Sequence, residues 1–309
     1  MRAFVRRTAA AAACVLVASS ALPAQGTGPA ALLISPQDLK SHLEDKSLVL
    51  LYVGPKDGYE KEHIPGARYV DFSTDLAVSD SARHMDLELP DEADLRARLE
   101  RLGIGDRSKI VVTPGEDWGS PSTRVVWSLQ AAGLGANTRL LNGGTLGWKA
   151  AGFPLTNVAP PAPAPGHLTV RADRSVVVDY KWIQAHADAP HVRIIDARSP
   201  VFYEGPGNPQ RRVAAGHIAG ARNIPFDGLF DDSVHVFAIA ELRKKFDAAG
   251  VAPGDTVAAY CHVGQQATMV VFAARLLGHP AVLYDGSMSD WKWRKLPLEG
   301  GTDTAAKRP

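Results

Sequence analysis

Cys261 is the residue of this chain whose type and position could carry covalent chemistry. It lies in "VAAYCHVGQQATMVVFAARLLG", residues 257–278, between an apolar run typical of a strand and a longer apolar run typical of a helix. A strand, a short turn and a helix bring several backbone N–H groups to one point, and the first N–H groups of a helix have no partner within it. Such donors would stabilise a thiolate and lower the thiol pKa, and they would attract an anionic substrate. The stretch therefore predicts a reactive thiolate in an anion-binding loop.

The residues around Cys261 have the sizes that such a loop requires. Gly264 allows the backbone to turn with positive φ and leaves space for a substrate. Ala267 and Thr268 then begin the helix without bulk. The alternative is a free cysteine buried as a small apolar side chain, which is common in proteins. The loop by itself leaves both interpretations open.

The N-terminus has the pattern of a secretory signal peptide. A basic start, "MRAFVRR", precedes the apolar run "TAAAAACVLVASSAL", and "LPAQG" offers small residues for cleavage after Ala24. A buried core helix is the alternative. Cleavage would remove residues 1–24, including Cys14, and would leave Cys261 as the only cysteine of the mature chain. An odd thiol in an exported protein is inert and buried, reactive, or paired with another chain, and we expect export to a periplasm.

Composition and charge narrow the class of protein. The 309 residues are 45% hydrophobic and 22% charged, which suits one or two globular domains. The formal net charge of +1 offers no basic field for nucleic acid, and no segment after the N-terminus is apolar enough to span a membrane. Asp227, Asp231 and Asp232 fit a solvated turn better than a metal site, and no ligand cluster has zinc-like spacing. We expect no metal and no cofactor.

The chain repeats itself on the two sides of a Pro/Ala-rich stretch. "NVAPPAPAPGH" has no periodicity and is typical of an extended, semi-rigid linker. Three motifs occur in the same order before and after it. The pairs are "HIPGARYVDF" (63–72) with "HIAGARNIPF" (217–226), "DLRARLERLGIGDRSKIVV" (94–112) with "ELRKKFDAAGVAPGDTVAA" (241–259), and "LLNGGTLGWKAAGFPL" (140–155) with "LYDGSMSDWKWRKLPL" (283–298). We predict a duplicated domain, with one copy over 30–156, the linker over 157–167 and the second copy over 168–300.

The two copies differ at the reactive turn. Aligning Gly103 with Gly250 places Pro114 opposite Cys261, so the duplicated fold does not need a cysteine there. Side chains that match in both copies are expected to support the fold instead; they are His63 with His217 and Trp148 with Trp291. The contrast favours a reactive role for Cys261.

Strand and helix patterns alternate within each copy. In the second copy the strands are "VRIIDA" (192–197), "DTVAAYC" (255–261) and "AVLYDG" (281–286), and the helices are "IAELRKKFDAAG" (239–250) and "QATMVVFAARLLG" (266–278). Short apolar strands that alternate with helices predict α/β domains, each with a mostly parallel sheet flanked by helices. Ligands bind such sheets beyond the carboxyl ends of the strands, where Cys261 lies.

At this point the sequence resembles the two-domain rhodaneses, the thiosulfate and 3-mercaptopyruvate sulfurtransferases. The motifs that carry the resemblance are "HIPGA", "HIAGARNIPF", "IIDARSP", "YCHVGQQAT" and "LYDGSMSDW", and it covers about residues 30–300. The resemblance implies tandem rhodanese-like domains, of which the C-terminal one is catalytic. It implies that Cys261 forms a persulfide, held by the backbone N–H groups of the loop. The loop residues are His262, Val263, Gly264, Gln265, Gln266 and Ala267.

The resemblance also implies the substrates, a small sulfur donor such as thiosulfate or 3-mercaptopyruvate and a thiophilic acceptor such as cyanide or a thiol. The sequence departs from the family where the donor is recognised. Phe202 stands where specialised members have an arginine in a "GR(F/Y)" setting, and "CHVGQQ" lacks a loop cation unless His262 is protonated. Arg198 either binds an anion or forms a salt bridge, with Asp196 as a candidate partner.

Two other functions compete with sulfur transfer. A thiolate phosphatase needs an arginine at the sixth position after the cysteine to hold phosphate, and that position is Ala267. A non-catalytic sulfur carrier, or a protein that docks a thiol redox partner, would keep Cys261 but depend on that partner. The missing arginine of the "GR(F/Y)" setting keeps the carrier interpretation open.

Overall fold

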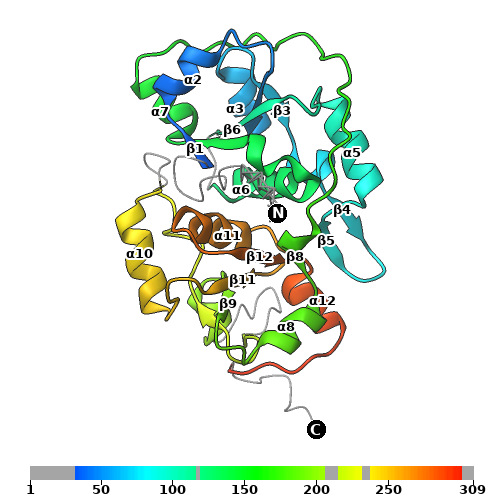
Figure 1. Cartoon of the computed structure of the whole chain (residues 1–309), viewed down its shortest axis with the longest axis vertical. Coiled ribbons are helices and arrows are strands. Elements are labelled where there is room, and N and C mark those ends of the chain that lie inside the picture. Colours follow the sequence, from blue (N-terminus) through cyan, green and yellow to red (C-terminus); the bar gives the residue numbers. More distant parts are fainter. Residues whose placement is uncertain (1–31, 116–118, 206–214, 232–236, 301–309) are drawn as a thin grey trace, which may run out of the picture.

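The structure, a computed structural model, describes residues 32–115, 119–205, 215–231 and 237–300. The predicted signal peptide, residues 1–24, lies outside the described residues. Figure 1 shows two α/β halves, one above the other along the long axis of the molecule. No helix within the described ranges has the length and apolar character needed to cross a membrane.

The N-terminal half is built on a parallel five-stranded sheet in the order β1-β7-β6-β2-β3. Its strands are β1 (Leu33–Ile34), β2 (Leu48–Val53), β3 (Arg68–Val70), β6 (Lys109–Pro114) and β7 (Thr138–Leu141). Its helices are α2 (Pro36–His42), α3 (Lys56–Lys61), α4 (Phe72–Asp75), α5 (Glu92–Arg101), α6 (Ser120–Leu129) and α7 (Gly144–Ala150), with a π-helical turn (Gln130–Leu134) and a 3₁₀ turn (Gly135–Asn137) after α6. A short antiparallel hairpin, β4 (Val78–Asp80) and β5 (Met85–Glu88), stands apart from the sheet.

The C-terminal half repeats this plan with the sheet order β10-β9-β11-β12-β8, again all parallel. Its strands are β8 (Val177–Val178), β9 (Val192–Asp196), β10 (Arg222–Asn223), β11 (Thr256–Tyr260) and β12 (Ala281–Tyr284). Its helices are α8 (Tyr180–His186), α9 (Pro200–Tyr203), α10 (Ile239–Ala248), α11 (Ala267–Leu276) and α12 (Ser287–Trp293), and a 3₁₀ turn (Arg174–Val176) precedes β8. The α/β fold class is therefore confirmed, and the strands and helices predicted in the second copy are present.

The duplication extends to the register of the central strands. Lys109, the first residue of β6, pairs with the first residue of β2, and Thr256, the first residue of β11, pairs with the first residue of β9. Counting forward from these pairs places Pro114 and Cys261 at the same point of the two sheets. β11 is buried at every residue after Thr256 because helices cover both faces of its sheet.

The residues that match between the copies support the fold. His63 and His217 each form an isolated β-bridge and each stack on a tyrosine at a ring-centroid distance of 3.9 Å. Trp148 and Trp291 are buried, and the indole N–H of each donates to a proline carbonyl six residues further on at 2.9 Å. These contacts are properties of the duplicated scaffold and not of one active site.

The Pro/Ala-rich stretch has no helix or strand and runs along the N-terminal half. Its end is tied to α5: the N–H of Gly166 donates to the carbonyl of Glu100 at 2.7 Å, and the N–H of Leu168 donates to the Glu100 carboxylate at 2.8 Å. Leu168 is buried against the core. These contacts hold the connection against one half instead of leaving it free in solvent.

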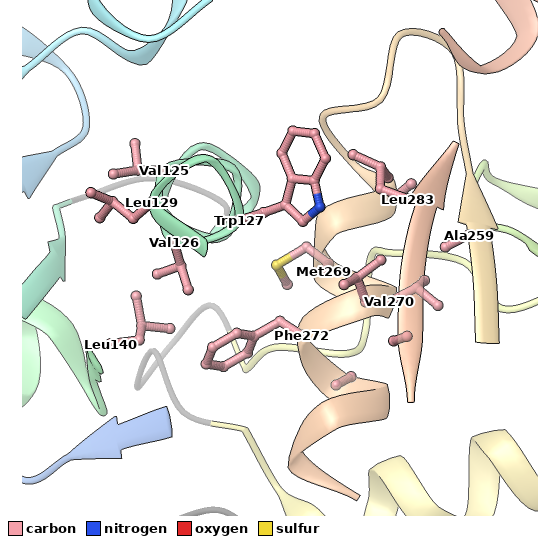
Figure 2. Close-up of a cluster of buried hydrophobic side chains, with 14 of the residues drawn as sticks. Val125, Val126, Trp127, Leu129, Leu140, Ala259, Met269, Val270, Phe272 and Leu283 are labelled. Carbon is pink, nitrogen blue, oxygen red and sulfur yellow. The ribbon is translucent and has the colours of Figure 1, made fainter. Parts of the chain in front are cut away.

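One hydrophobic core joins the two halves, because α6 and α11 pack against each other. Figure 2 shows Val126 and Trp127 of α6 facing Met269 and Phe272 of α11, and all four side chains are buried. Neither helix has an exposed face: every residue of α6 is buried, and α11 is buried except at Arg275. Each helix is covered on one side by its own sheet and on the other by the opposite half of the molecule.

Candidate active site

Cys261 follows the central strand β11 directly and begins the loop that leads into α11. Its side chain is fully buried, with 0% of its surface exposed. Four backbone N–H groups contact its sulfur, those of Ala267, Val263, Gln266 and Gly264. Donors that converge in this way can hold a negative charge on the sulfur, or on an atom bonded to it.

The side chains of the remaining two loop residues, His262 and Gln265, contact residues outside the loop. The imidazole of His262 meets the ring of Phe202 edge to face, with the ring centroids 4.7 Å apart. The side-chain amide of Gln265 donates to the hydroxyl of Ser120, on α6, at 3.1 Å. One residue therefore faces α9 of its own half, and the other bridges to the N-terminal half.

Gly264 allows the loop to close. Its φ is +79°, and a Cβ added there would lie 2.5 Å from the carbonyl oxygen of Asp285 and 3.0 Å from the guanidinium of Arg124. A side chain would therefore be strained by the backbone and blocked by its neighbours. The glycine predicted from the sequence is required by both the conformation and the space.

The start of α12 fixes the backbone on the other side of Cys261. The N–H of Cys261 donates to the hydroxyl of Ser287 at 3.1 Å, and the N–H of Met288 donates to the carbonyl of Cys261 at 3.1 Å. The hydroxyl and the N–H of Ser289 both donate to the carbonyl of His262 at 3.1 Å. Ser287 has a φ of +50°, a rare value for a residue with a side chain, and this conformation accompanies its contact with Cys261.

Burial raises the pKa of the Cys261 thiol, although the N–H groups of Ala267, Val263, Gln266 and Gly264 oppose that shift. The expectation of a lowered pKa is therefore wrong. The sequence predicted the N–H donors, but it could not show that the sulfur would be wholly removed from water, which penalises the charged form.

His262 cannot supply the missing loop cation near neutral pH. Burial, followed by the positive charge of Arg198, lowers the pKa of His262 to about 4. The imidazole is therefore neutral above that pH. Because His262 is not protonated near neutral pH, it does not give the loop a positive charge there.

We expect the rate of Cys261 alkylation by iodoacetamide to rise with pH from about 6 to beyond 8.5, the ordinary thiol pKa. Because the folded pKa lies above that value, the reactive thiolate fraction keeps increasing about tenfold per pH unit across this range. The measurement is a pH series of inactivation rates, with the urea-unfolded chain as the matched control. A plateau that begins below about pH 7 would contradict the raised pKa, since it would mean that the thiol is already ionised there.

Arg198 forms a salt bridge with Asp196, while its Nη1 has no hydrogen-bond partner among the described residues. Its side chain is 0% exposed and donates to both carboxylate oxygens of Asp196, through Nε at 2.9 and 3.1 Å and through Nη2 at 2.5 Å. Nη2 also donates to the carbonyl of Gly216 at 2.7 Å. The salt bridge that the sequence left open is present and fixes the end of β9, and a role of Arg198 in anion binding stays a prediction.

The N-terminal half contacts the loop through the first turns of α6. The hydroxyls of Thr123 and Thr268 are 2.8 Å apart across the interface, and Ser120 accepts the bond from Gln265. All three hydroxyl side chains are buried. Buried hydroxyls need partners, and here each finds one on the opposite half, so the N-terminal half forms part of the wall around the loop.

Arg124 of α6 makes the most extensive of these contacts. Its guanidinium is 1% exposed and donates to the carboxylate of Asp285 at 2.5 Å, to the carbonyl of Gly264 at 3.3 Å and to the carbonyl of Leu87 at 2.5 Å. It also lies 4.5 Å from the ring centroid of Trp127. One side chain of the N-terminal half thus forms hydrogen bonds with the loop after Cys261, with the turn after β12 and with β5.

Sequence reasoning missed Arg124, Asp285 and Ser287. The available signal for Arg124 was a lone cation inside "SPSTRVVWSL", an otherwise uncharged helix. A charged residue in such a helix is buried only when it is paired. Nothing in the sequence, however, indicates that two of its partners, Asp285 and Gly264, lie in the other copy of the domain.

Comparison with known proteins agrees with this geometry. A model of the family described as "Rhodanese-like domain" matches residues 35–151 and 179–293. The chain is 32% identical over 275 residues to the "Probable 3-mercaptopyruvate sulfurtransferase" of Pseudomonas aeruginosa, covering 84% of this chain and 95% of that protein. It is 30% identical over 243 residues to the thiosulfate sulfurtransferase of Bos taurus, covering 77% of this chain and 80% of that protein.

Solved structures show the same fold at lower identity. SseA from Escherichia coli superposes with a TM-score of 0.70 at 24% identity, covering 82% of this chain and 98% of that one. YnjE superposes with a TM-score of 0.76 at 22% identity, covering 87% of this chain and 68% of that one. Since the family model matches each half of the molecule once, the chain belongs to the rhodanese-like domain family, with two copies of the domain.

Proposed function

We propose that this rhodanese-type sulfurtransferase moves sulfane sulfur as a persulfide on Cys261. The donor is a small molecule such as thiosulfate or 3-mercaptopyruvate, and the acceptor is a thiophile such as cyanide or a thiol. The observation that carries the proposal is the position of the Cys261 sulfur, which is contacted by four backbone N–H groups at the carboxyl end of the central strand. The names of the similar proteins support the donors.

The chemistry takes two steps that share the same sulfur site. The Cys261 thiolate attacks the outer sulfur of thiosulfate, a new S–S bond forms on Cys261, and sulfite leaves with the electron pair of the bond that breaks. The acceptor then attacks the outer sulfur of the persulfide; cyanide becomes thiocyanate, and the Cys261 thiolate is restored. In both steps the negative charge lies on sulfur atoms within reach of the N–H groups of Val263, Gly264, Gln266 and Ala267, which lowers the barrier as an oxyanion hole does.

Arg198 and Asp196 are paired at the end of β9. The residue between them joins β9 to β11, since the N–H of Ala197 donates to the carbonyl of Tyr260 at 2.9 Å. This contact positions the residue before Cys261. We therefore assign the pair a positioning role in the proposed reaction.

Intact-mass measurement tests the intermediate directly. After treatment with thiosulfate, 3-mercaptopyruvate or a polysulfide, the chain is expected to gain the mass of one sulfur atom, and peptide mapping is expected to place it on Cys261. Cyanide should then remove that sulfur and release an equal amount of thiocyanate. Thiocyanate formation without any loaded chain would contradict the persulfide, and loading that needs a second protein would favour the carrier function.

We also propose that the chain is exported to the periplasm after cleavage following Ala24. The support is the order of basic, apolar and small residues over positions 1–24. N-terminal sequencing of protein from fractionated cells tests this: a periplasmic chain that begins at Gln25 is expected. A cytoplasmic chain that retains Met1 would contradict export without affecting the proposed reaction.

A further inference from the structure

The β4–β5 hairpin of the N-terminal half reaches the C-terminal half at the turn after β12 (Figure 1). Met85, the first residue of β5, is buried, and a Cβ added to Gly286 would lie 3.0 Å from the end of the Met85 side chain. The hairpin therefore packs directly on that turn. Glu88, the last residue of β5, is half-buried, and its carboxyl group has no hydrogen bond or ion pair with the described residues.

The two peptide groups that flank Glu88 bind both members of a buried ion pair. The carbonyl of Leu87 accepts from Nη2 of Arg124 at 2.5 Å, and the N–H of Leu89 donates to the carboxylate of Asp285 at 2.7 Å. Arg124 and Asp285 pair with each other across the interface, and both are buried. Glu88 is therefore fixed beside a carboxylate that is already ionised and a guanidinium that already has its anion.

The surroundings of Glu88 favour its neutral form. Ionisable side chains from the turn after β12, from α6, α12, β12 and the β4–β5 turn act on it, and they are Asp285, Arg124, Asp290, Tyr284 and Arg83. Both cations are already engaged, since Arg124 donates to Asp285 and Arg83 donates to Asp80 at 2.7 Å. Removal from water, followed by the negative charge of Asp285, raises the pKa of Glu88 to about 7. Glu88 therefore holds a proton at about pH 5–6, where an exposed glutamate is ionised.

Ionisation of Glu88 would weaken the contact that holds the loop after Cys261. The bond from Arg124 to the carbonyl of Gly264 measures 3.3 Å, whereas its bonds to Leu87 and to Asp285 measure 2.5 Å. Nε of Arg124 is buried without a hydrogen-bond partner among the described residues, so a new carboxylate beside it would attract the guanidinium. Repulsion from Asp285 would also push the hairpin away from the turn after β12. We propose that Glu88 is a positioning residue for the proposed sulfur transfer: when protonated it keeps the two halves closed and Arg124 on Gly264, and when ionised it loosens both contacts.

Unfolding equilibria test the effect on the interface. Glu88→Gln keeps the size of the protonated side chain and cannot ionise. Because the pKa of folded Glu88 is raised above the ordinary 4.5, its contribution to stability is fully present below about pH 4.5 and is lost as the pH rises through about 7. The folding equilibrium constant of the wild-type chain, divided by that of Glu88→Gln, is expected to fall at least about tenfold between about pH 5 and 8. The same ratio for the exposed control Glu44→Gln should stay constant, and a constant ratio for Glu88→Gln would overturn the inference.

A direct titration of the carboxyl group gives a second measurement on the folded chain. Carbon-13 NMR of the protein labelled at its glutamate side-chain carboxyls follows each group with pH, and the signal that disappears in Glu88→Gln belongs to Glu88. Its midpoint is expected near pH 7. A midpoint below about 5, the range of an exposed glutamate, would overturn the inference. Neither this titration nor the unfolding measurement depends on sulfur transfer.

The pH profile of thiocyanate formation tests the effect on the loop. Cys261 ionises in both chains, so the ratio of kcat for Glu88→Gln to kcat for the wild-type chain removes its contribution. This ratio is expected to be near one at about pH 6 and about threefold at about pH 8.5, because a looser loop positions the sulfur less well. In the Arg124→Met background, which has no guanidinium to attract, the ratio should not change with pH.

Hydrogen exchange of the peptide that contains Gly264 measures the same contact without any donor. Above about pH 7 the wild-type peptide is expected to exchange about threefold faster than the Glu88→Gln peptide at the same pH, and below about pH 6 equally fast. Equal exchange at every pH, or a kcat ratio that stays near one, would overturn the positioning role. If no donor loads sulfur on Cys261, the proposed function fails, and the exchange measurement still decides whether Glu88 controls the loop.

Discussion

Replacing Cys261 with serine is expected to lower kcat/KM for thiocyanate formation by roughly four orders of magnitude or more. Serine has nearly the size of cysteine, and its hydroxyl oxygen can accept hydrogen bonds from the same N–H groups, so the loop is expected to keep its shape. Its hydroxyl is hardly ionised at neutral pH and does not form a stable bond to sulfane sulfur, so the covalent step is lost. The measurement is thiocyanate release under steady-state conditions, with intact mass recorded for the same samples.

The duplicated domain provides a control for this substitution. Pro114 occupies the position in the N-terminal half that Cys261 occupies in the C-terminal half. Pro114→Ala is therefore expected to retain activity within about twofold, since the four N–H groups that contact the Cys261 sulfur all belong to the second copy. A Cys261→Ser chain that keeps turnover comparable to the Pro114→Ala chain would exclude the persulfide mechanism.

Replacing Arg124 with methionine is expected to destabilise the chain by about 3–5 kcal/mol, the usual cost of removing one partner of a buried ion pair. The substitution leaves the Asp285 carboxylate in the interface without its cation, and its side chain is only 9% exposed. It also releases the carbonyl of Gly264, one of the points at which the loop is held. We expect kcat to fall about tenfold as well, because loose positioning of the reacting sulfur raises the barrier.

Denaturant unfolding followed by tryptophan fluorescence measures the first effect, and thiocyanate release measures the second. Lys149→Met is the matched control: its pair with Glu62 is exposed, so its loss is expected to cost about 0–1 kcal/mol and no activity. The double variant Arg124→Met/Asp285→Leu should regain part of the lost stability, since it removes the unpaired carboxylate. It should not regain kcat, because Gly264 still lacks its donor. A single Arg124→Met chain with wild-type stability and kcat would show that the interface does not hold the loop.

Most of the fold could be predicted from the sequence because its signals are local. The order of "DTVAAYC" and "QATMVVFAARLLG" specifies a strand, a turn and a helix, and the structure has β11 and α11 there. The ordered repeat of motifs specified two copies of one domain, and the family model matches each copy once. Such patterns depend on the periodicity of apolar residues, which a single chain displays in full.

The candidate site was only partly predictable, since some of its properties depend on burial. The N–H donors follow from the turn and helix, but the pKa of Cys261 moves in the opposite direction to that expected because the sulfur is wholly enclosed. Arg198 had two interpretations that sequence could not separate, and only the distances to Asp196 show the salt bridge. Local donors can be inferred from the chain order; removal from water cannot.

The sequence by itself determined the duplicated α/β fold, the turn that presents Cys261 and the proline at the matching position of the other copy. Tertiary structure alone decided which side chains from distant segments meet at that turn: Arg124 from the other half, Ser287 from the start of α12, and Phe202 against His262. The reason is physical. Backbone conformation follows from neighbours along the chain, whereas burial, charge pairing and the side chains that surround Cys261 depend on which surfaces the two halves bury against each other.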